Sequence, residues 1–215
     1  MKIITCRSDI ISLYNFILSE NPTYNKEKFI RSVHTGLLRK KIKFPVLEYA
    51  AGLLLNTVPD KKQLSFLDKI ISLDEIGSYV LAGKILQLRA EKYYSESINK
   101  ACEYIISGDK WYSCDIISER VMGFSLLKYP IKTIPILRKL ALNKNKWIVR
   151  SVGVAAHYAV KKGLDKNHTE KVFLLLIENA VTTDFHTKKG IGWGAKTIAK
   201  FHPELIKKHH DRIYK

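Results

Sequence analysis

Apolar residues recur along much of this chain with the period of an α-helix. In the stretch DKKQLSFLDKIISL, residues 60–73, Leu64, Leu67 and Ile70 recur at intervals of three residues, which places them on one face of a helix. The stretch DKNHTEKVFLLLIENAV, residues 165–181, has the same kind of period. No stretch shows the sustained strict alternation of a half-buried strand bounded by hairpin turns. The sequence therefore predicts an all-α fold.

Residues typical of helix boundaries support this interpretation. Proline suits the first helical turn, where its missing N–H has no intrahelical partner to lose, and three prolines fit such positions: Pro45, Pro130 and Pro203. Aspartate side chains accept hydrogen bonds from the free N–H groups of a helix start, and three fit as N-caps: Asp60, Asp74 and Asp184. Gly163 suits the end of the helix that precedes residue 165. We expect short connections between these helices.

Internal spacing favours a stack of helix pairs over a globular bundle. Trp111 precedes Trp147 by 36 residues, and Arg150 precedes Lys188 by 38. These spacings lie near the roughly 40–47 residues of HEAT and armadillo helix pairs. We therefore predict one domain over residues 1–215, a HEAT-like helical-repeat solenoid in which antiparallel helix pairs form a curved stack. The second helices of such pairs line one extended concave surface.

The net charge points to an anionic partner. The chain has 37 Lys and Arg against 20 Asp and Glu, a formal charge of +17. Residues 144–215 carry +9 of this charge in one third of the length. A field of this strength attracts polyanions, and nucleic acid is the leading candidate. A membrane partner is not expected, because the apolar run AAGLLLNTV is far shorter than the roughly 20 residues of a spanning helix.

The N-terminal stretch and the cysteines indicate an intracellular protein. Arg7 and Asp9 interrupt the apolar run of MKIITCRSDIISLYNFILSE, which is typical of an amphipathic helix and not of a signal peptide. Cys6, Cys102 and Cys114 are scattered and form no CxxC pair. The seven histidines include no HExxH motif, so we expect no metal site and no cofactor. The expected location is cytoplasmic, in association with DNA.

Three helical segments hold candidate functional residues, and the last of them combines an aromatic side chain with lysines. In KKGIGWGAKTIAKFHP, one helical face holds Lys189, Trp193, Lys196 and Lys200. Such a face suits a surface that follows phosphates and contacts sugars or bases, although a core tryptophan with solvated lysines has the same pattern. The glycines beside Trp193 each weaken a helix by roughly 0.5–1 kcal/mol relative to alanine. They indicate either close helix packing or close approach of a ligand to the backbone.

The segments NKWIVRS and KWYSCDIIS hold the remaining candidates. Arg150 suits a bidentate phosphate contact or, alternatively, a structural role between stacked repeats, and Trp147 suits the core. Trp111 and Asp115 are four residues apart and share one helical face. Asp115 is either an ordinary cap or surface acid, or a carboxylate aimed at positive charge. On a DNA-binding surface, a carboxylate repels phosphates but stabilises the oxocarbenium-like sugar that forms when a nucleotide loses its base.

Together, KWYSCD, KWIVRS and KKGIGWGAK resemble motifs of the AlkD-type DNA alkylation repair glycosylases. The resemblance covers about residues 108–205 and implies a HEAT-repeat solenoid that binds duplex DNA in a basic cleft. It further implies hydrolysis of cationic alkylated purines, such as 7-methylguanine and 3-methyladenine, without base flipping. Trp111, Asp115 and Trp193 would frame the nucleotide, and Arg150 would grip the backbone. Further DNA contacts are expected from the lysines of these segments: Lys146, Lys188, Lys189, Lys196 and Lys200.

The expected protein is thus a monomeric, monofunctional DNA glycosylase. Two other classes stay open from the residues. A non-catalytic HEAT-like module that binds damaged or branched DNA would share the basic groove and make no use of Asp115. A protein-interaction scaffold would have an apolar groove for an acidic partner.

Overall fold

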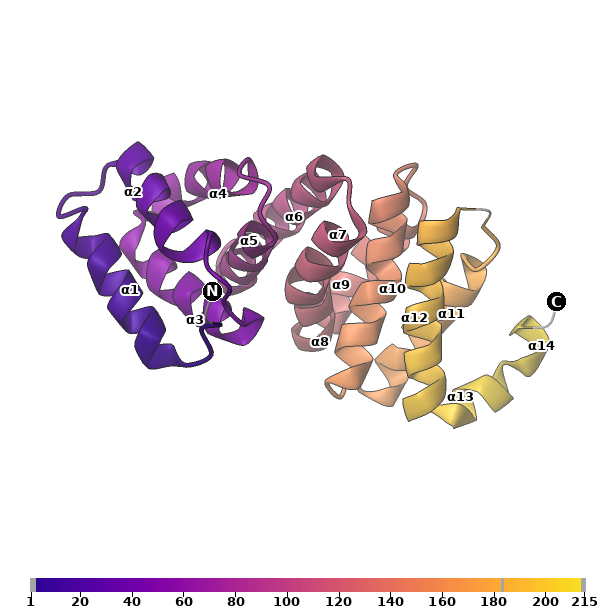
Figure 1. Cartoon of the computed structure of the whole chain (residues 1–215). Coiled ribbons are helices and arrows are strands. Elements are labelled where there is room, and N and C mark those ends of the chain that lie inside the picture. The colour runs from indigo at the N-terminus through magenta and orange to yellow at the C-terminus, as the bar shows by residue number, and fades with distance from the viewer. Residues whose placement is uncertain (1–2, 183, 214–215) are drawn as a thin grey trace. The chain divides into compact units, whose positions relative to one another are not determined.

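The all-α prediction is confirmed by the computed structural model, which describes residues 3–182 and 184–213 (Figure 1). These described residues are mostly helical, and their extended structure is limited to one parallel bridge between Ile4 and Ile42. The chain divides into two compact units, residues 1–89 and residues 90–215, which we call unit 1 and unit 2. The prediction of a single domain over residues 1–215 stays a prediction.

Unit 1 is built around fully buried aromatic side chains. Its helices are α1 (Arg7–Ser19), α2 (Lys26–Val33) with a π-helical turn (His34–Leu38), α3 (Phe44–Thr57), a 3₁₀ turn (Asp60–Lys62), α4 (Gln63–Ile71) and α5 (Ile76–Arg89). Phe29 of α2 and Phe66 of α4 have their ring centroids 5.9 Å apart. Of the apolar face predicted for residues 60–73, Leu67 and Ile70 have no exposed surface and Leu64 is half-buried. Burial of such faces is the main favourable contribution to folding.

Unit 2 consists of three successive helix pairs and a C-terminal extension. Its helices are α6 (Tyr94–Gly108), α7 (Trp111–Ser118), a π-helical turn (Glu119–Gly123), α8 (Phe124–Lys128), α9 (Pro130–Ala141), α10 (Lys146–Lys161), α11 (Lys166–Glu178), α12 (Phe185–Phe201), α13 (Pro203–Lys208) and α14 (His210–Ile213). The segments α7, the π-helical turn and α8 follow one another without a gap. The pairs are α6 with α7–α8, α9 with α10, and α11 with α12.

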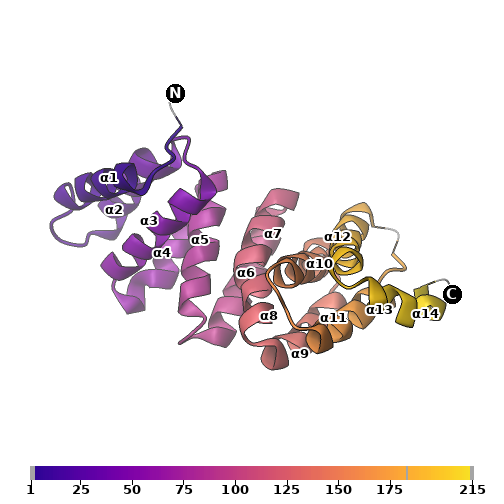
Figure 2. The same cartoon turned by 90° about the horizontal axis from the view of Figure 1, so that it is seen from below.

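The second helices of these pairs form one layer of unit 2. Helix α10 contacts α7 on one side and α12 on the other, while α9 contacts α11 in the layer behind (Figures 1 and 2). The second helices begin at Trp111, Lys146 and Phe185, close to the spacing of 36–38 residues seen in the sequence. This arrangement is consistent with a helical-repeat fold, and it brings the three candidate segments onto neighbouring helices.

Most of the predicted helix boundaries are confirmed. Each of the three prolines lies in a first turn, the Asp184 side chain accepts a hydrogen bond from the Thr187 N–H, and Gly163 follows α10 with a left-handed φ of 94°. The predictions for the other two aspartates were wrong. Asp60 begins the 3₁₀ turn before α4, and Asp74 lies two residues before α5, where it accepts a hydrogen bond from the Tyr79 hydroxyl.

Glycines let the backbones of α10 and α12 come very close. A Cβ atom added to Gly153 of α10 would lie 2.0 Å from the Gly190 carbonyl oxygen, and one added to Gly194 would lie 2.6 Å from the Gly153 oxygen. Real Cβ contacts are not this short, so only glycine fits. Close helix packing therefore explains two of the three glycines beside Trp193. A Cβ on the third, Gly192, would have no neighbour within 4 Å.

Candidate nucleic-acid interface

The three candidate segments meet at one hollow in unit 2. The hollow has a volume of about 390 Å³ and is lined by side chains of α7, α10 and α12 only. The lining residues are Trp111, Asp115, Arg150, Lys188, Lys189, Gly192, Trp193 and Lys196. Four of these eight residues are cationic and one is acidic, so the hollow is suited to an anionic ligand.

Helix α7 presents an indole and a carboxylate one turn apart. Asp109 adopts a left-handed φ of 41° at the end of α6, and Lys110 is extended, so the chain reverses and α7 begins at Trp111. Trp111 is 58% exposed, while the Asp115 side chain is only 13% exposed. The turn is held from α10, because the Trp147 indole N–H donates to Asp109 at 2.5 Å. Trp147 itself is 3% exposed, which confirms its predicted place in the core.

The Asp115 carboxylate forms a bidentate ion pair with Arg150. Arg150 Nε donates to Oδ1 and Nη2 donates to Oδ2, each at 2.8 Å, and Nη1 donates to the His186 carbonyl oxygen at 3.0 Å. Arg150 is thereby bonded to α7 and to α12 at once. Burial disfavours its charged form, but the hydrogen bonds and charge of Asp115 outweigh this effect, so the pKa of Arg150 is raised.

This ion pair changes the interpretation of both residues. Arg150 is 8% exposed and its guanidinium already serves protein acceptors, which fits the structural role that the sequence left open. Asp115, in turn, shares its negative charge with the guanidinium, and it still lines the hollow with the part of its side chain that is exposed. A buried pair in this geometry fixes the carboxylate in one orientation, because two parallel hydrogen bonds to a planar guanidinium leave it little freedom.

Trp193 lies on α12 with its ring covered on one side by a histidine. The His157 imidazole of α10 stacks on the indole, with centroids 4.0 Å apart and planes inclined by 25°. His157 is two helical turns after Arg150 on the same face of α10, and this spacing is the one sequence signal that points to it. His157 was not among the site residues predicted from the sequence.

The predicted lysines are placed in three different ways. Lys188, Lys189 and Lys196 are exposed and line the hollow. Lys146 lines a neighbouring hollow at the start of α10, with its Nζ atom 5.0 Å from the centroid of the Trp147 ring. Lys200 does not line either of these hollows, and its Nζ lies 5.7 Å from the ring centroid of Phe201. The structure therefore groups Lys188, Lys189 and Lys196 with the aromatic and acidic candidates.

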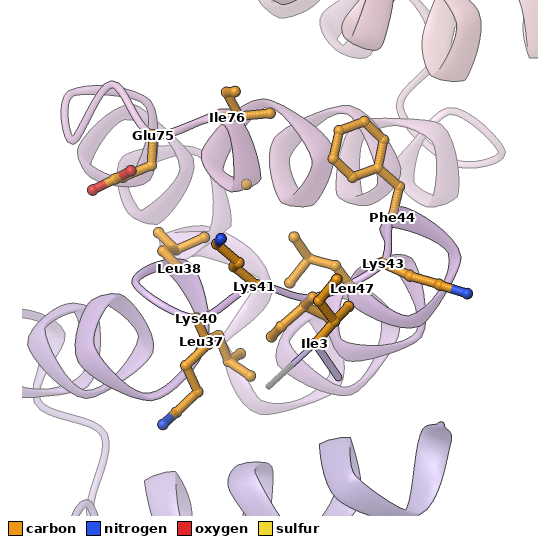
Figure 3. A pocket seen from close by; sticks show the side chains of 12 residues that line it. Ile3, Leu37, Leu38, Lys40, Lys41, Lys43, Phe44, Leu47, Glu75 and Ile76 are labelled. Atoms are coloured by element: carbon orange, nitrogen blue, oxygen red, sulfur yellow. The ribbon is translucent and has the colours of Figure 1, made fainter. Parts of the chain in front are cut away.

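Unit 1 has a hollow of a different character, with a volume of about 400 Å³ (Figure 3). Leucines and exposed apolar side chains line it together with lysines: Leu37, Leu38, Leu47, Ile3, Phe44, Ile76, Lys40, Lys41 and Lys43. Its acid, Glu75, lies 3.5 Å from the His34 ring nitrogen. The lining of this hollow includes no tryptophan, whereas the hollow of unit 2 is lined by two tryptophans and an aspartate.

The three cysteines are free thiols. Burial raises the pKa of Cys102 to about 11 and that of Cys114 to about 12, so both are protonated and unreactive at neutral pH. Among the described residues, we find no helix with the length and apolar character that a membrane crossing requires.

The fold and the site define an all-α protein with a cationic, indole-lined hollow on a layer of second helices, as expected of a DNA-binding repeat protein. Comparison with protein families identifies the family to which this chain belongs. The model of the DNA alkylation repair enzyme family matches residues 42–213, and the chain belongs to this family. The match extends into unit 1, beyond the residues 108–205 that carry the sequence resemblance. No curated protein and no solved structure matches the chain. Family membership supports a role in DNA repair.

Proposed function

We propose that this protein is a monofunctional DNA glycosylase that removes cationic alkylated purines from duplex DNA without flipping the base. The observation that carries the proposal is the hollow of unit 2, where one carboxylate, that of Asp115, lies among Trp111, Trp193 and exposed lysines. Membership in the DNA alkylation repair enzyme family supports the same conclusion. In this proposal, the protein acts in the cell in association with DNA. It is a monomer and has a HEAT-like repeat fold.

The chemistry needs little from the protein beyond charge stabilisation. An N-alkylated purine carries a positive charge, so when the bond between C1′ and the base nitrogen breaks, its electron pair neutralises the departing base. C1′ then has oxocarbenium character, and water adds to it and loses a proton, which leaves an abasic sugar. A carboxylate directed at C1′ lowers the energy of this cationic state and orients the water. Asp115 is the lining residue with this capability.

The other lining residues have supporting roles in the proposal. Arg150 orients the Asp115 carboxylate through two hydrogen bonds, and this role replaces the direct phosphate contact expected from the sequence. The indoles of Trp111 and Trp193 contact the sugar and favour a cationic nucleotide through their π faces. Lys188, Lys189 and Lys196 neutralise the flanking phosphates, as duplex binding requires. Lys146 and Lys200 extend the contact beyond the hollow.

One observation favours a different function. Because Arg150 neutralises Asp115, the carboxylate has a structural reason to lie on a DNA-binding surface even without catalysis. A non-catalytic module that binds damaged or branched DNA would keep the same ion pair. The hollow of unit 1, with its leucines and exposed apolar side chains, would suit a protein-binding scaffold, and it shares no lining residue with the hollow of unit 2.

Replacement of Asp115 by asparagine separates these functions. Asp115→Asn leaves the buried Arg150 without its charged partner, so it is assayed at a temperature where thermal unfolding shows it to be folded. We then expect it to bind duplex DNA as well as the wild type, while the rate of 7-methylguanine release falls by about two orders of magnitude or more, as for loss of a group that stabilises a transition-state charge. Asp211→Asn is the matched control, because it makes the same change of charge on a side chain that is 96% exposed. Equal release rates for both variants would exclude the role given to Asp115.

A further inference from the structure

His157 is a titratable group in direct contact with the candidate site that the proposed mechanism does not use. It lies on α10, half-buried, and its ring stacks on the Trp193 indole at a centroid distance of 4.0 Å. Trp193 also lines the hollow in which the nucleotide would lie. The indole is thus covered on one face by an imidazole and contributes to the ligand site with its remaining surface. Whatever charge the imidazole carries acts directly on this ring.

The hydrogen bonds around Thr197 determine which nitrogen of His157 holds a proton. The Thr197 hydroxyl donates to the Trp193 carbonyl oxygen at 3.0 Å, so its hydrogen is already used. Its oxygen lies 2.7 Å from His157 Nδ1 and must accept, so Nδ1 carries the hydrogen. The neutral ring is therefore the Nδ1–H tautomer, and the proton that makes the ring cationic is gained and lost at Nε2.

The surroundings favour the neutral ring. Burial lowers the pKa of His157, Lys161 one turn later on α10 lowers it further, and Asp115 of α7 opposes them. Helix α12 contacts the ring through Trp193 and Thr197, which are uncharged. The net pKa is below the ordinary value near 6.5, so at neutral pH the indole is backed by an uncharged ring.

We propose that His157 is a positioning residue for Trp193: the neutral ring holds the indole in place, and the protonated ring opposes binding of a cationic nucleotide. A neutral imidazole leaves the π electrons of the indole available to a cation at the ligand site. An imidazolium stacked on the same ring interacts with those π electrons itself. It also places a positive charge on the far side of the indole, which repels a cationic nucleotide. The inference rests on the proposed function, since it assigns a pH dependence to the same site.

Tryptophan fluorescence tests the His157–Trp193 contact without any DNA, because a protonated imidazole stacked on an indole quenches its emission. We expect the emission of the wild type to fall as the pH is lowered below about 6.5, because the folded ring gains its proton below that value. The other tryptophans also contribute to the emission, and the ring centroids of Trp147 and His186 lie 4.4 Å apart. The quantity to compare is therefore the difference between the wild type and His157→Gln, and this difference should vanish in a Trp193→Phe background. Superimposable titrations of the wild type and His157→Gln would overturn the proposal.

Base release from methylated duplex DNA tests the consequence for the site. His157→Phe keeps an aromatic ring on Trp193 and cannot titrate, whereas His157→Ala removes the support. At pH 7.5 we expect His157→Ala to lower kcat for release roughly tenfold or more, with a smaller change in KM, because a displaced indole misplaces the reacting sugar. His157→Phe should retain most of the activity at this pH.

The pH dependence distinguishes positioning from a merely structural role. Relative to spontaneous depurination, release by the wild type should decline between pH 7.5 and pH 5.5 more steeply than release by His157→Phe. If base release by the wild type and by His157→Phe declines equally over this range, while both proteins stay folded at the assay temperature, the proposal is overturned. If the wild type releases no base at all, the proposed function has failed, and the fluorescence titration still decides whether His157 and Trp193 are coupled.

Discussion

The ion pair between Asp115 and Arg150 is the residue-scale feature on which the site depends. Because both side chains are largely buried, removal of one partner leaves the other as an uncompensated charge. We expect Arg150→Ala to lower the free energy of unfolding by about 3–5 kcal/mol, measured by chemical denaturation. Arg138→Ala breaks an exposed pair with Glu178 and should cost less than about 1 kcal/mol. Equal losses for the two variants would contradict the structural importance of the buried pair.

The His157 titration also affects stability, with a sign that follows from its lowered pKa. The unfolded chain binds a proton at His157 more readily than the folded chain, so stability rises with pH across this window. The contribution is complete above the unfolded pKa near 6.5 and is lost as the pH falls toward the lower folded pKa. We therefore expect the thermal midpoint of the wild type to drop on acidification more than that of His157→Phe. Parallel curves for the two proteins would show that burial of the ring does not perturb its titration.

Helical periodicity predicts which side chains come together only where they share one helix, and the family resemblance was needed to group Arg150 and Trp193 with them. The pair Trp111 and Asp115 follows from helical periodicity, and the structure places both at the hollow. The bond from Arg150 to Asp115 crosses 35 residues of sequence, and no local spacing encodes it. For the same reason, the stack of His157 on Trp193 could not be found from the sequence, because it depends on how α10 crosses α12.

Among the helices, the contact between α10 and α12 positions the side chains that line the hollow of unit 2. Gly153→Ala would push a Cβ into the backbone of α12, which cannot move aside as a side chain would. We expect it to destabilise unit 2 by about 1–3 kcal/mol or more, measured by thermal or chemical unfolding.

Gly192→Ala is the matched control, since it has open space around the added carbon and gains helix propensity. It should stabilise the protein by roughly 0.5–1 kcal/mol. Because Gly192 lines the hollow, base release by this variant also reports whether DNA approaches the backbone there. A stabilising effect of Gly153→Ala would contradict the close helix crossing.

Helices and their order were predictable because each apolar period buries one face in the core. Their boundaries were less so: Asp184 caps α12 as predicted, while Asp60 and Asp74 lie in turns whose conformation depends on tertiary contacts. The glycines beside Trp193 left two explanations open, and only the neighbouring helix identifies close packing at Gly190 and Gly194.

At the scale of the whole molecule, the charge of +17 implies DNA binding that weakens as salt increases. Each lysine that contacts a phosphate contributes about one unit to the slope of log affinity against log salt. We expect Lys196→Gln, at the hollow, to weaken binding and reduce this slope by about one. Lys132→Gln, an exposed lysine on α9 in the other layer of unit 2, should leave the slope unchanged. If both variants have the same slope, Lys196 does not contact a phosphate, and the hollow is not part of the DNA-binding surface.

The site of unit 2, as proposed, breaks a glycosidic bond and does not merely bind DNA. The most direct measurement is a single-turnover assay on a duplex with one 7-methylguanine, in which free base and abasic DNA are quantified against a protein-free control. We predict release well above the spontaneous rate, with one abasic site formed for each base released and no strand cleavage by the protein. Binding of the duplex with release no faster than in the control would contradict the proposed glycosylase activity and support a non-catalytic DNA-binding module.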